Sequence, residues 1–197
     1  MHFIGDVHAK FADYHRLIQD LPESIQLGDM GIGFRDFTPS ENENHRFIRG
    51  NHDNPHICML TPGYLGEFGY LEEHEIFFLG GAWSIDQAYR IEGRDWWPEE
   101  ELDYAQFSDA MELYKKIRPK TVITHGCPFS MYDFLMDNPL TPIKIKKHKC
   151  RTASALDAMF QEHQPEKWIF AHFHRSAEFE MNGTFFKALN ELEIFEL

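Results

Sequence analysis

Short apolar runs alternate with segments of helical periodicity along most of this chain. The runs at 2–4, 24–27, 46–49, 75–79, 121–124 and 168–171 predict strands, because each is short and closes on glycine or polar residues. Apolar residues recur at helical spacing in 11–21, 107–117 and 156–160 and predict helices there, the first ending near Pro22. Strands that alternate with helices indicate an α/β layered fold. Asn182-Gly183 predicts a hairpin turn in the tail.

Length and composition describe an ordinary globular protein. The 197 residues predict a single domain over 1–197, and 43% of them are hydrophobic, without a run long enough to span a membrane. The first residues lack the pattern of a signal peptide. Cys58, Cys127 and Cys150 are too few and too scattered for a disulfide framework or a cysteine zinc site. We therefore expect a reducing, cytoplasmic location and no membrane partner.

The charge balance disfavours a general nucleic-acid-binding role. Lys and Arg number 19 against 32 Asp and Glu, which gives a net charge of −13. Bound metal cations would reverse the sign locally. The basic run at 144–149 could gather polyanionic substrates, or could be a solvated face, which is the commoner role of such runs. The sequence favours no particular oligomeric state.

Polar residues follow five of the predicted strands, either directly or one glycine beyond the strand. They are Asp6, Asp29, Asn51, His125 and His172. In open α/β sheets, ligands bind outside the carboxyl ends of the strands. We therefore expect these five side chains to converge on one site.

The residue types in and beside this set are those of a metal centre. In the Asp6-Val7-His8 segment an extended chain would point the carboxylate and the imidazole the same way, and His172-Phe173-His174 would repeat that geometry. Each motif alone is common by chance, so their order at strand ends carries the argument. Carboxylate, imidazole and amide ligands without thiolate suit Mn, Fe, Zn or Ni. Seven groups can serve two ions only if one of them bridges, and Asp29 is the natural candidate.

At these residues the chain resembles the calcineurin-like metallophosphoesterases. The ordered blocks of that family correspond to Gly5-Asp6-Val7-His8, Gly28-Asp29, Gly50-Asn51-His52-Asp53, His125-Gly126 and Ala171-His172-Phe173-His174. The resemblance implies a four-layer αββα sandwich of two mixed β-sheets flanked by helices. It also implies that one metal is held by Asp6, His8, Asp29 and His174, and the second by Asp29, Asn51, His125 and His172. The stretches 80–86 and 96–100 look like those of small microbial and phage members.

Three departures from the family pattern bear on the substrate and the metals. Ala9 and Ala171 stand where the family usually has glycine, but both are small, so metal binding is little affected. The Gly28-Asp29-Met30 segment lacks the Asp-Arg-Gly continuation of the serine/threonine protein phosphatases, which disfavours a phosphoprotein substrate.

The expected chemistry is hydrolysis by a hydroxide that bridges two metal ions, most simply Mn²⁺, so that no residue is covalently modified. We expect Cys127 to be a packed thiol rather than a nucleophile. His52 is the candidate general acid, since imidazole can carry a proton near neutral pH. Asp53 could orient His52 and raise its pKa, or could cap the helix suggested by Asn54-Pro55.

Substrate contacts are the least specific part of the pattern. Candidate phosphate-binding residues are Arg49, Arg90, Arg94 and Arg175, and each could instead be a solvated surface arginine. Trp83, Trp96 and Trp97 could form a lid or a stacking wall, or could pack in the core.

The predicted function is hydrolysis of a phosphomonoester, a phosphodiester or a nucleotide. The alternatives are a nuclease with the same metal centre and a noncatalytic scaffold on this fold. The presence of His52 together with all seven metal groups favours the enzyme over the scaffold.

Overall fold

The computed structural model describes residues 1–136 and 150–197 of the chain. Within these residues, no helix combines the length and the apolar character needed to cross a membrane. The basic run at 144–149 lies outside the described residues.

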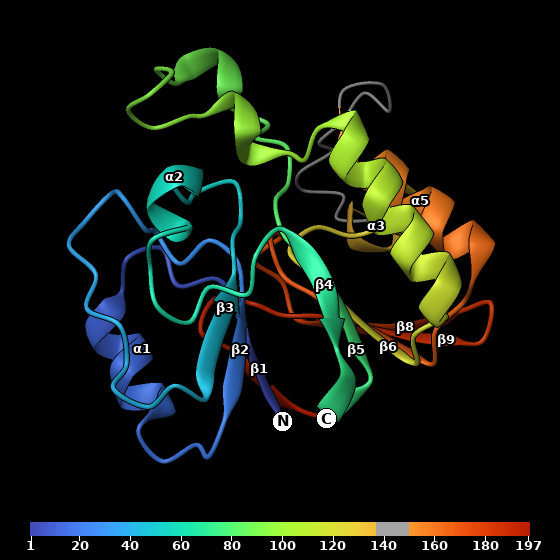
Figure 1. The fold of residues 1–197 in the computed structure, drawn as a ribbon, viewed down its shortest axis with the longest axis horizontal. Helices are drawn as coiled ribbons and strands as arrows, with labels where there is room; N and C mark the ends of the chain where they lie inside the picture. The colour runs from blue at the N-terminus through green and yellow to red at the C-terminus, as the bar shows by residue number, and fades with distance from the viewer. Residues whose placement is uncertain (137–149) are drawn as a thin grey trace.

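The strands form two sheets, each with parallel and antiparallel neighbours (Figure 1). The smaller sheet has the order β10 (Ile194–Glu196), β1 (His2–Ile4), β2 (Ser24–Leu27) and β3 (His45–Ile48), with only β10 antiparallel to its neighbour. The larger sheet has the order β4 (Phe68–Leu71), β5 (Ile76–Leu79), β6 (Thr121–Thr124), β7 (Lys167–Phe170), β9 (Thr184–Ala188) and β8 (Ala177–Met181). Its edge strands β4 and β8 are antiparallel to the parallel strands between them.

The helices lie on the outer sides of the two sheets (Figure 1). On the side of the smaller sheet are α1 (Phe11–Ile18) and α2 (Pro55–Cys58), and on the side of the larger sheet are α3 (Tyr104–Ile117), α4 (Tyr132–Met136) and α5 (Arg151–Glu162). Short 3₁₀ turns occur at Glu72–His74, Gln87–Tyr89, Pro98–Glu100 and Phe129–Met131.

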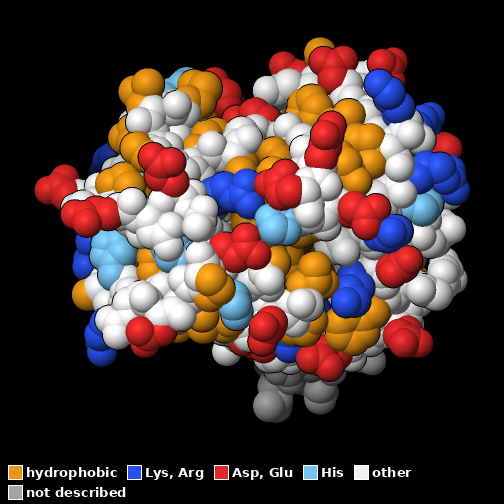
Figure 2. All heavy atoms as spheres, turned by 60° about the horizontal axis from the view of Figure 1, so that its bottom comes forward, with side chains coloured by type: hydrophobic (Ala, Val, Ile, Leu, Met, Phe, Trp, Pro, Cys, Tyr) orange, Lys and Arg blue, Asp and Glu red, His pale blue; other side chains and the backbone are white. Residues whose placement is uncertain are grey.

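Acidic and basic side chains are interspersed over the face drawn in Figure 2. The net negative charge is therefore not gathered into one patch on that face.

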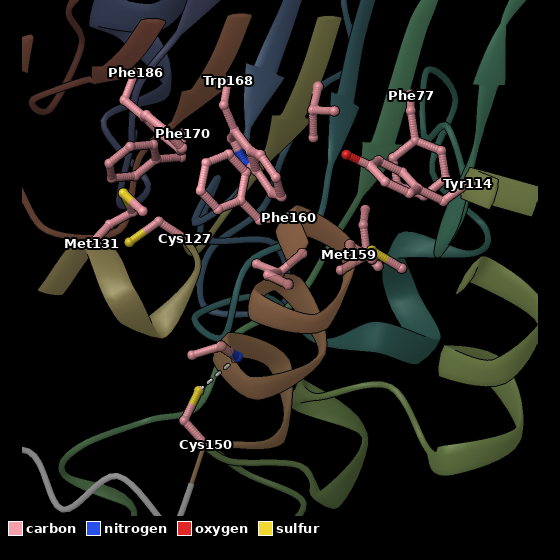
Figure 3. Packing of buried hydrophobic residues seen from close by; sticks show 14 of the residues in the cluster. Phe77, Tyr114, Cys127, Met131, Cys150, Met159, Phe160, Trp168, Phe170 and Phe186 are labelled. Carbon is pink, nitrogen blue, oxygen red and sulfur yellow. Dashed lines mark hydrogen bonds between the residues drawn. The ribbon is translucent and has the colours of Figure 1, made fainter. Parts of the chain in front are cut away.

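Three apolar clusters separate the layers. Residues alternate along β5: Ile76 and Phe78 pack between the two sheets, whereas Phe77 and Leu79 pack beneath α3 and α5. Figure 3 shows the outer cluster of the larger sheet, where Phe77 meets Tyr114 of α3. A third cluster lies between the smaller sheet and α1. Helix, sheet, sheet and helix therefore follow one another, which confirms the predicted four-layer α/β sandwich.

Most predicted elements are present with small shifts at their ends. The turn at Asn182-Gly183 joins β8 and β9, as predicted. The helix expected over 11–21 ends earlier, at Ile18, because Leu21 donates its backbone N–H to the Ile18 carbonyl in a turn. Strand β4 was not predicted. Its four residues are all partly exposed at the sheet edge and carry a glycine, so they lack the buried apolar run of the other strands.

Candidate active site

The carboxyl ends of five strands deliver the predicted site residues to one region. Asp6 follows β1, Asp29 follows β2, and Asn51 follows β3, all from the smaller sheet. His125 directly follows β6, and His172 follows β7, both from the larger sheet. The site therefore lies where the ends of the two sheets meet, as the strand-end pattern predicted.

One group of potential metal ligands contains Asp6, His8, Asp29 and His174, whose donor atoms all lie within 4.8 Å of one another. The Nε2 atoms of His8 and His174 are 2.8 Å apart, and that of His174 is 3.0 Å from Asp6 Oδ2. His8 Nε2 is also 3.9 Å from Asp29 Oδ2. Carboxylate and imidazole donors from three loops thus face a common point.

A second group contains Asp29, His125 and His172. His125 Nε2 lies 3.2 Å from Asp29 Oδ1 and 3.2 Å from His172 Nδ1. Asn51 Oδ1 joins this group at 3.1 Å from His125 Nε2. Asp29 belongs to both groups, with Oδ2 toward the first and Oδ1 toward the second. The structure thus brings together all seven residues that the resemblance implies.

In the described part of the chain, several acceptor atoms at this site face one another without a hydrogen-bond donor between them, and a cation would satisfy them. Asp6 Oδ2 is buried and accepts no hydrogen bond among the described residues, although two imidazoles face it. His125 Nδ1 lies 2.7 Å from the Leu27 carbonyl and must donate to it, which leaves its Nε2 lone pair facing Asn51 Oδ1 when the ring is neutral. These residues therefore fit a divalent ion with oxygen and imidazole ligands.

The electrostatics of the site also favour positive charge. Burial acts to lower the pKa of His125, but the carboxylates of Asp29 and Asp6 outweigh it and raise this pKa to about 9. Burial acts to raise the pKa of Asp29, yet the neighbouring imidazoles, led by His125, hold it well below its usual range. The carboxylates are therefore ionised, and a cation at this point is stabilised.

The ligand-bearing turns have an unusual backbone. His8, Asp29, His172 and His174 have φ values of 48°, 55°, 70° and 50°, in the left-handed region. The expectation that Asp6-Val7-His8 and His172-Phe173-His174 are extended is therefore wrong. Both segments turn sharply, and the turn rather than a strand brings the side chains together. Left-handed conformations at non-glycine residues are costly and concentrate at functional sites.

Two glycines leave room for the ligands. A Cβ at Gly28 would lie 2.5 Å from His125 Nδ1, and one at Gly50 would lie 2.1 Å from Asp29 Oδ1. Gly28 also has a φ of 90°. Glycine is therefore required directly before Asp29 and before Asn51, because any larger residue there would collide with another ligand.

Asp53 has a different place from either role expected for it. Its buried carboxylate accepts backbone N–H groups at 2.7–3.2 Å, those of Met30, Gly31, Ile32 and Gly50. It therefore fastens the loop after β2 to the loop after β3 instead of orienting the His52 ring. The N-cap of α2 is Asn54, which accepts from the backbone of His56 and Ile57.

His52 lies beside the ligand groups and meets an arginine. Its backbone N–H donates to Asp29 Oδ1 at 2.7 Å, and Arg90 Nη2 lies 2.6 Å from its Nε2. Burial lowers the pKa of His52, and Arg90 adds to this effect while Asp29 opposes it. Asp86 holds the same guanidinium, because its carboxylate accepts from Nε at 2.8 Å and from Nη2 at 2.9 Å.

The other candidate arginines lie elsewhere. Arg49 is 1% exposed, and its guanidinium is engaged by the Glu67 carboxylate and the Glu100 carbonyl, so it is a structural residue rather than a substrate ligand. Arg94 pairs with Asp95 in an exposed turn. Arg175 donates to the Leu135 carbonyl. Of the four, Arg90 is the one that contacts His52.

Trp97 and Cys127 are buried, whereas Trp83 and Trp96 are partly buried and line a pocket together. Trp97 is buried and meets Phe34 edge-on, with ring centroids 5.8 Å apart. Trp83 packs against the core of the larger sheet and contacts Gln87. Trp96 is partly buried. Cys127 is fully buried, and burial raises the pKa of its thiol well above the usual value.

Sequence reasoning missed two groups that contact the ligands. Ser84 accepts a hydrogen bond from Asn51 and is itself held by Glu100. Glu191 lies 3.5 Å from Nδ1 of His174. The stretches 80–86 and 96–100 had a distinctive sequence, but nothing in it pointed from Ser84 to Asn51.

The family model of the calcineurin-like phosphoesterases matches residues 2–176, which include every ligand-bearing turn. The chain belongs to this family. The family is metal-dependent, in keeping with the His and Asp groups that meet in the structure.

Individual similarities are more limited. Over 67 residues the chain is 44% identical to Glucose-6-phosphate isomerase 1 of Streptomyces avermitilis, a stretch of 32% of this chain and 12% of that protein. A phosphopantetheinyl hydrolase of Mycobacterium tuberculosis is 12% identical, with 96% and 89% of the two chains covered and a TM-score of 0.49. A predicted phosphoesterase of Streptococcus pneumoniae is also 12% identical, with 96% and 72% covered and a TM-score of 0.39. The chain spans too little of the isomerase for that activity to be transferred.

Proposed function

We propose that this calcineurin-like phosphoesterase is a dinuclear metal-dependent hydrolase of a small phosphomonoester, phosphodiester or nucleotide. The observation that supports this most is the pair of ligand groups that share Asp29, with the His52–Arg90 contact beside them. The proposed ligands are two carboxylates, one amide and four imidazoles, without a cysteine among them. Such a set suits two ions such as Mn²⁺, with Fe, Zn or Ni as other candidates.

The ligand sets follow from the two groups. The first ion would be held by Asp6, His8, Asp29 and His174, and the second by Asp29, Asn51, His125 and His172. When bound, the ions supply positive charge for an anionic substrate and lower the pKa of water, which then serves as the nucleophile.

His52 lies where it can donate a proton to the leaving group. Its ring borders the first ligand group, with its centroid 5.3 Å from that of His8. Burial and Arg90 lower the pKa of His52 in the free protein, so the protonated ring is favoured only when an anionic phosphoryl group lies beside it. The protonated imidazole can then donate to the departing alkoxide oxygen, which is otherwise a poor leaving group. His52 therefore acts as the general acid.

Arg90 binds the phosphoryl group. In this structure its Nη2 contacts the His52 ring, 2.6 Å from Nε2, so the guanidinium and the imidazole border the same side of the ligand groups. A phosphoryl oxygen bound beside them would replace this contact and accept from both groups, and such charge-assisted hydrogen bonds are strong. Asp86 keeps the guanidinium oriented.

Two model substrates test the proposal. The purified protein is stripped with a chelator, reloaded with Mn²⁺, and assayed with para-nitrophenyl phosphate and its bis ester, with metal content measured in parallel. The expected result is hydrolysis of at least one ester that disappears on stripping and returns on reloading.

The same assay separates the alternatives. Protein that retains Mn²⁺ but hydrolyses neither ester would overturn the enzyme and favour a noncatalytic scaffold. A parallel assay with single-stranded DNA tests the nuclease alternative, which requires cleavage that depends on the same metal.

A further inference from the structure

We infer that Ser84 and Glu100 are positioning residues that decide which end of the Asn51 amide faces the metal centre. The inference rests on the proposed function, because it assigns these residues a role toward the second ion. Both lie in the segment between β5 and α3, which Figure 1 shows at the same end of the molecule as α2.

The contacts form a buried chain. Asn51 Nδ2 donates to Ser84 Oγ at 3.0 Å, and Ser84 Oγ donates to Glu100 Oε2 at 2.5 Å. The backbone N–H of Ser84 donates to the other carboxylate oxygen, Oε1, at 2.9 Å. Asn51, Ser84 and Glu100 are 2%, 1% and 3% exposed, so these hydrogen bonds face little competition from water.

The direction of this chain is set by the carboxylate. Both Glu100 carboxylate oxygens accept from Ser84, one from the backbone N–H and one from the hydroxyl, so the single hydroxyl proton points to Glu100. The Ser84 oxygen then has only lone pairs left for its other neighbour, and that neighbour must donate. Of the two ends of the Asn51 amide only the NH₂ group donates, so Oδ1 must face the opposite way.

The opposite side is the metal centre. Asn51 Oδ1 lies 3.1 Å from His125 Nε2, within the group that would hold the second ion. A reversed amide would direct two N–H donors at that point, where a cation needs an oxygen. The chain from Glu100 through Ser84 therefore selects the amide orientation that can bind metal.

Arg49 fixes the segment that carries Ser84 and Glu100 in place. The carbonyl of Glu100 accepts from Arg49 Nη1 at 2.8 Å, and Arg49 directly follows β3 on the way to Asn51. A Cβ at Gly81 would lie 2.4 Å from the same carbonyl, so glycine permits this close approach. The buried Arg49 thereby ties the positioning segment to the loop that carries Asn51.

Two substitutions test the inference through metal affinity. Ser84→Ala removes the acceptor that holds the Asn51 amide. Glu100→Gln is nearly isosteric, but its NH₂ group would face Ser84 Oγ, because its oxygen is needed by the Ser84 backbone N–H. The direction of the chain then reverses. Calorimetric titration of metal-free protein with Mn²⁺ should show one of two sites weakened by about tenfold to a hundredfold in each variant.

A control and a rescue separate positioning from structural damage. Glu101→Gln alters the neighbouring buried glutamate, which accepts from the Thr152 backbone at 2.8 Å, and should leave both Mn²⁺ affinities unchanged. Asn51→Asp presents oxygen in either orientation. In that background Ser84→Ala should therefore no longer weaken the second site.

The outcomes are distinct. If wild-type protein binds no Mn²⁺, the proposed function and the inference both fail. If it binds two ions but Ser84→Ala and Glu100→Gln bind them equally well, the inference fails and the proposed function stands. Equal weakening by Glu101→Gln, or persistence of the Ser84→Ala loss in the Asn51→Asp background, also overturns the inference.

Discussion

Nη2 of Arg90 lies 2.6 Å from Nε2 of His52, so a residue from the segment between β5 and α3 touches the loop that follows β3. The guanidinium is always charged, and its Nε and Nη2 atoms donate to Asp86. This contact places the proposed phosphate-binding arginine against the candidate general acid.

Arg90→Ala should weaken substrate binding more than it slows the chemical step. Hydrogen bonds to charged groups contribute about 1.5–3 kcal/mol, which corresponds to a KM for a phosphomonoester raised by roughly tenfold to a hundredfold. Steady-state kinetics with Mn²⁺-loaded protein measure this. Arg94→Ala is the matched control, since Arg94 pairs with Asp95 in an exposed turn, and a similar rise in KM there would contradict the assignment.

His52→Ala should lower kcat while leaving the metals bound. Loss of a general acid typically reduces the rate by about 10²–10⁴, and His52 is not among the grouped metal ligands. Rate and metal content are measured on the same sample, with the exposed His56→Ala on α2 as control. Loss of metal from the His52 variant would show that this residue is a ligand instead.

Gly50→Ala should disrupt the metal centre, whereas Gly126→Ala should not. The added Cβ at position 50 would lie 2.1 Å from Asp29 Oδ1, but at position 126 the nearest atom is the Ala82 Cβ at 3.6 Å. Metal content after gel filtration distinguishes the two variants. Full metal content in the Gly50 variant would mean that the loops can move apart freely.

Asp53→Asn should destabilise the fold. The carboxylate accepts from four backbone N–H groups, and an amide leaves at least one of them facing another donor. Leaving a buried group unsatisfied costs about 1–3 kcal/mol, and in a chain of this size each kcal/mol lowers Tm by about 2–4 °C. Thermal unfolding should show this drop, while Asp13→Asn at the exposed Asp13–Arg16 pair should leave Tm nearly unchanged.

Burial of His45 should make the protein less stable in mild acid. Burial lowers the pKa of His45 in the folded state, so the unfolded chain binds more protons, and this contribution to stability is lost as pH falls below about 6.5. The free energy of unfolding of wild type relative to His45→Gln should therefore decrease between pH 7.5 and pH 5. Denaturant titrations at both pH values measure it, and a difference that does not change with pH would refute the assignment.

The strand and helix pattern predicted the α/β class and the convergence of the strand-end residues, whereas the four-layer arrangement was predicted from the family resemblance. Strands such as Ser24–Leu27 and Thr121–Thr124 are short, buried on both faces and followed by glycine or histidine, so their ends located Asp29 and His125. Partly exposed strand β4 carried no such pattern.

The sequence pattern did not predict which side chains contact one another. Asp53 lies next to His52 in sequence, which suggested a dyad, but the chain turns there and directs the carboxylate to the loop after β2. Arg49 was a candidate phosphate ligand in the sequence, but its side chain is buried and paired with Glu67. Ser84 and Glu100 act across 33 and 49 residues from Asn51, and contacts over such separations depend on tertiary packing.

The left-handed backbone at His8, Asp29, His172 and His174 lowers the stability of the fold at four positions whose side chains the proposed function requires. Glycine adopts that backbone without steric cost, so a descendant relieved of the need to hydrolyse its substrate would gain stability by acquiring glycine at these positions. Decay of the proposed hydrolase into an inert fold should therefore begin at these candidate metal-binding turns, while the apolar layers stay intact.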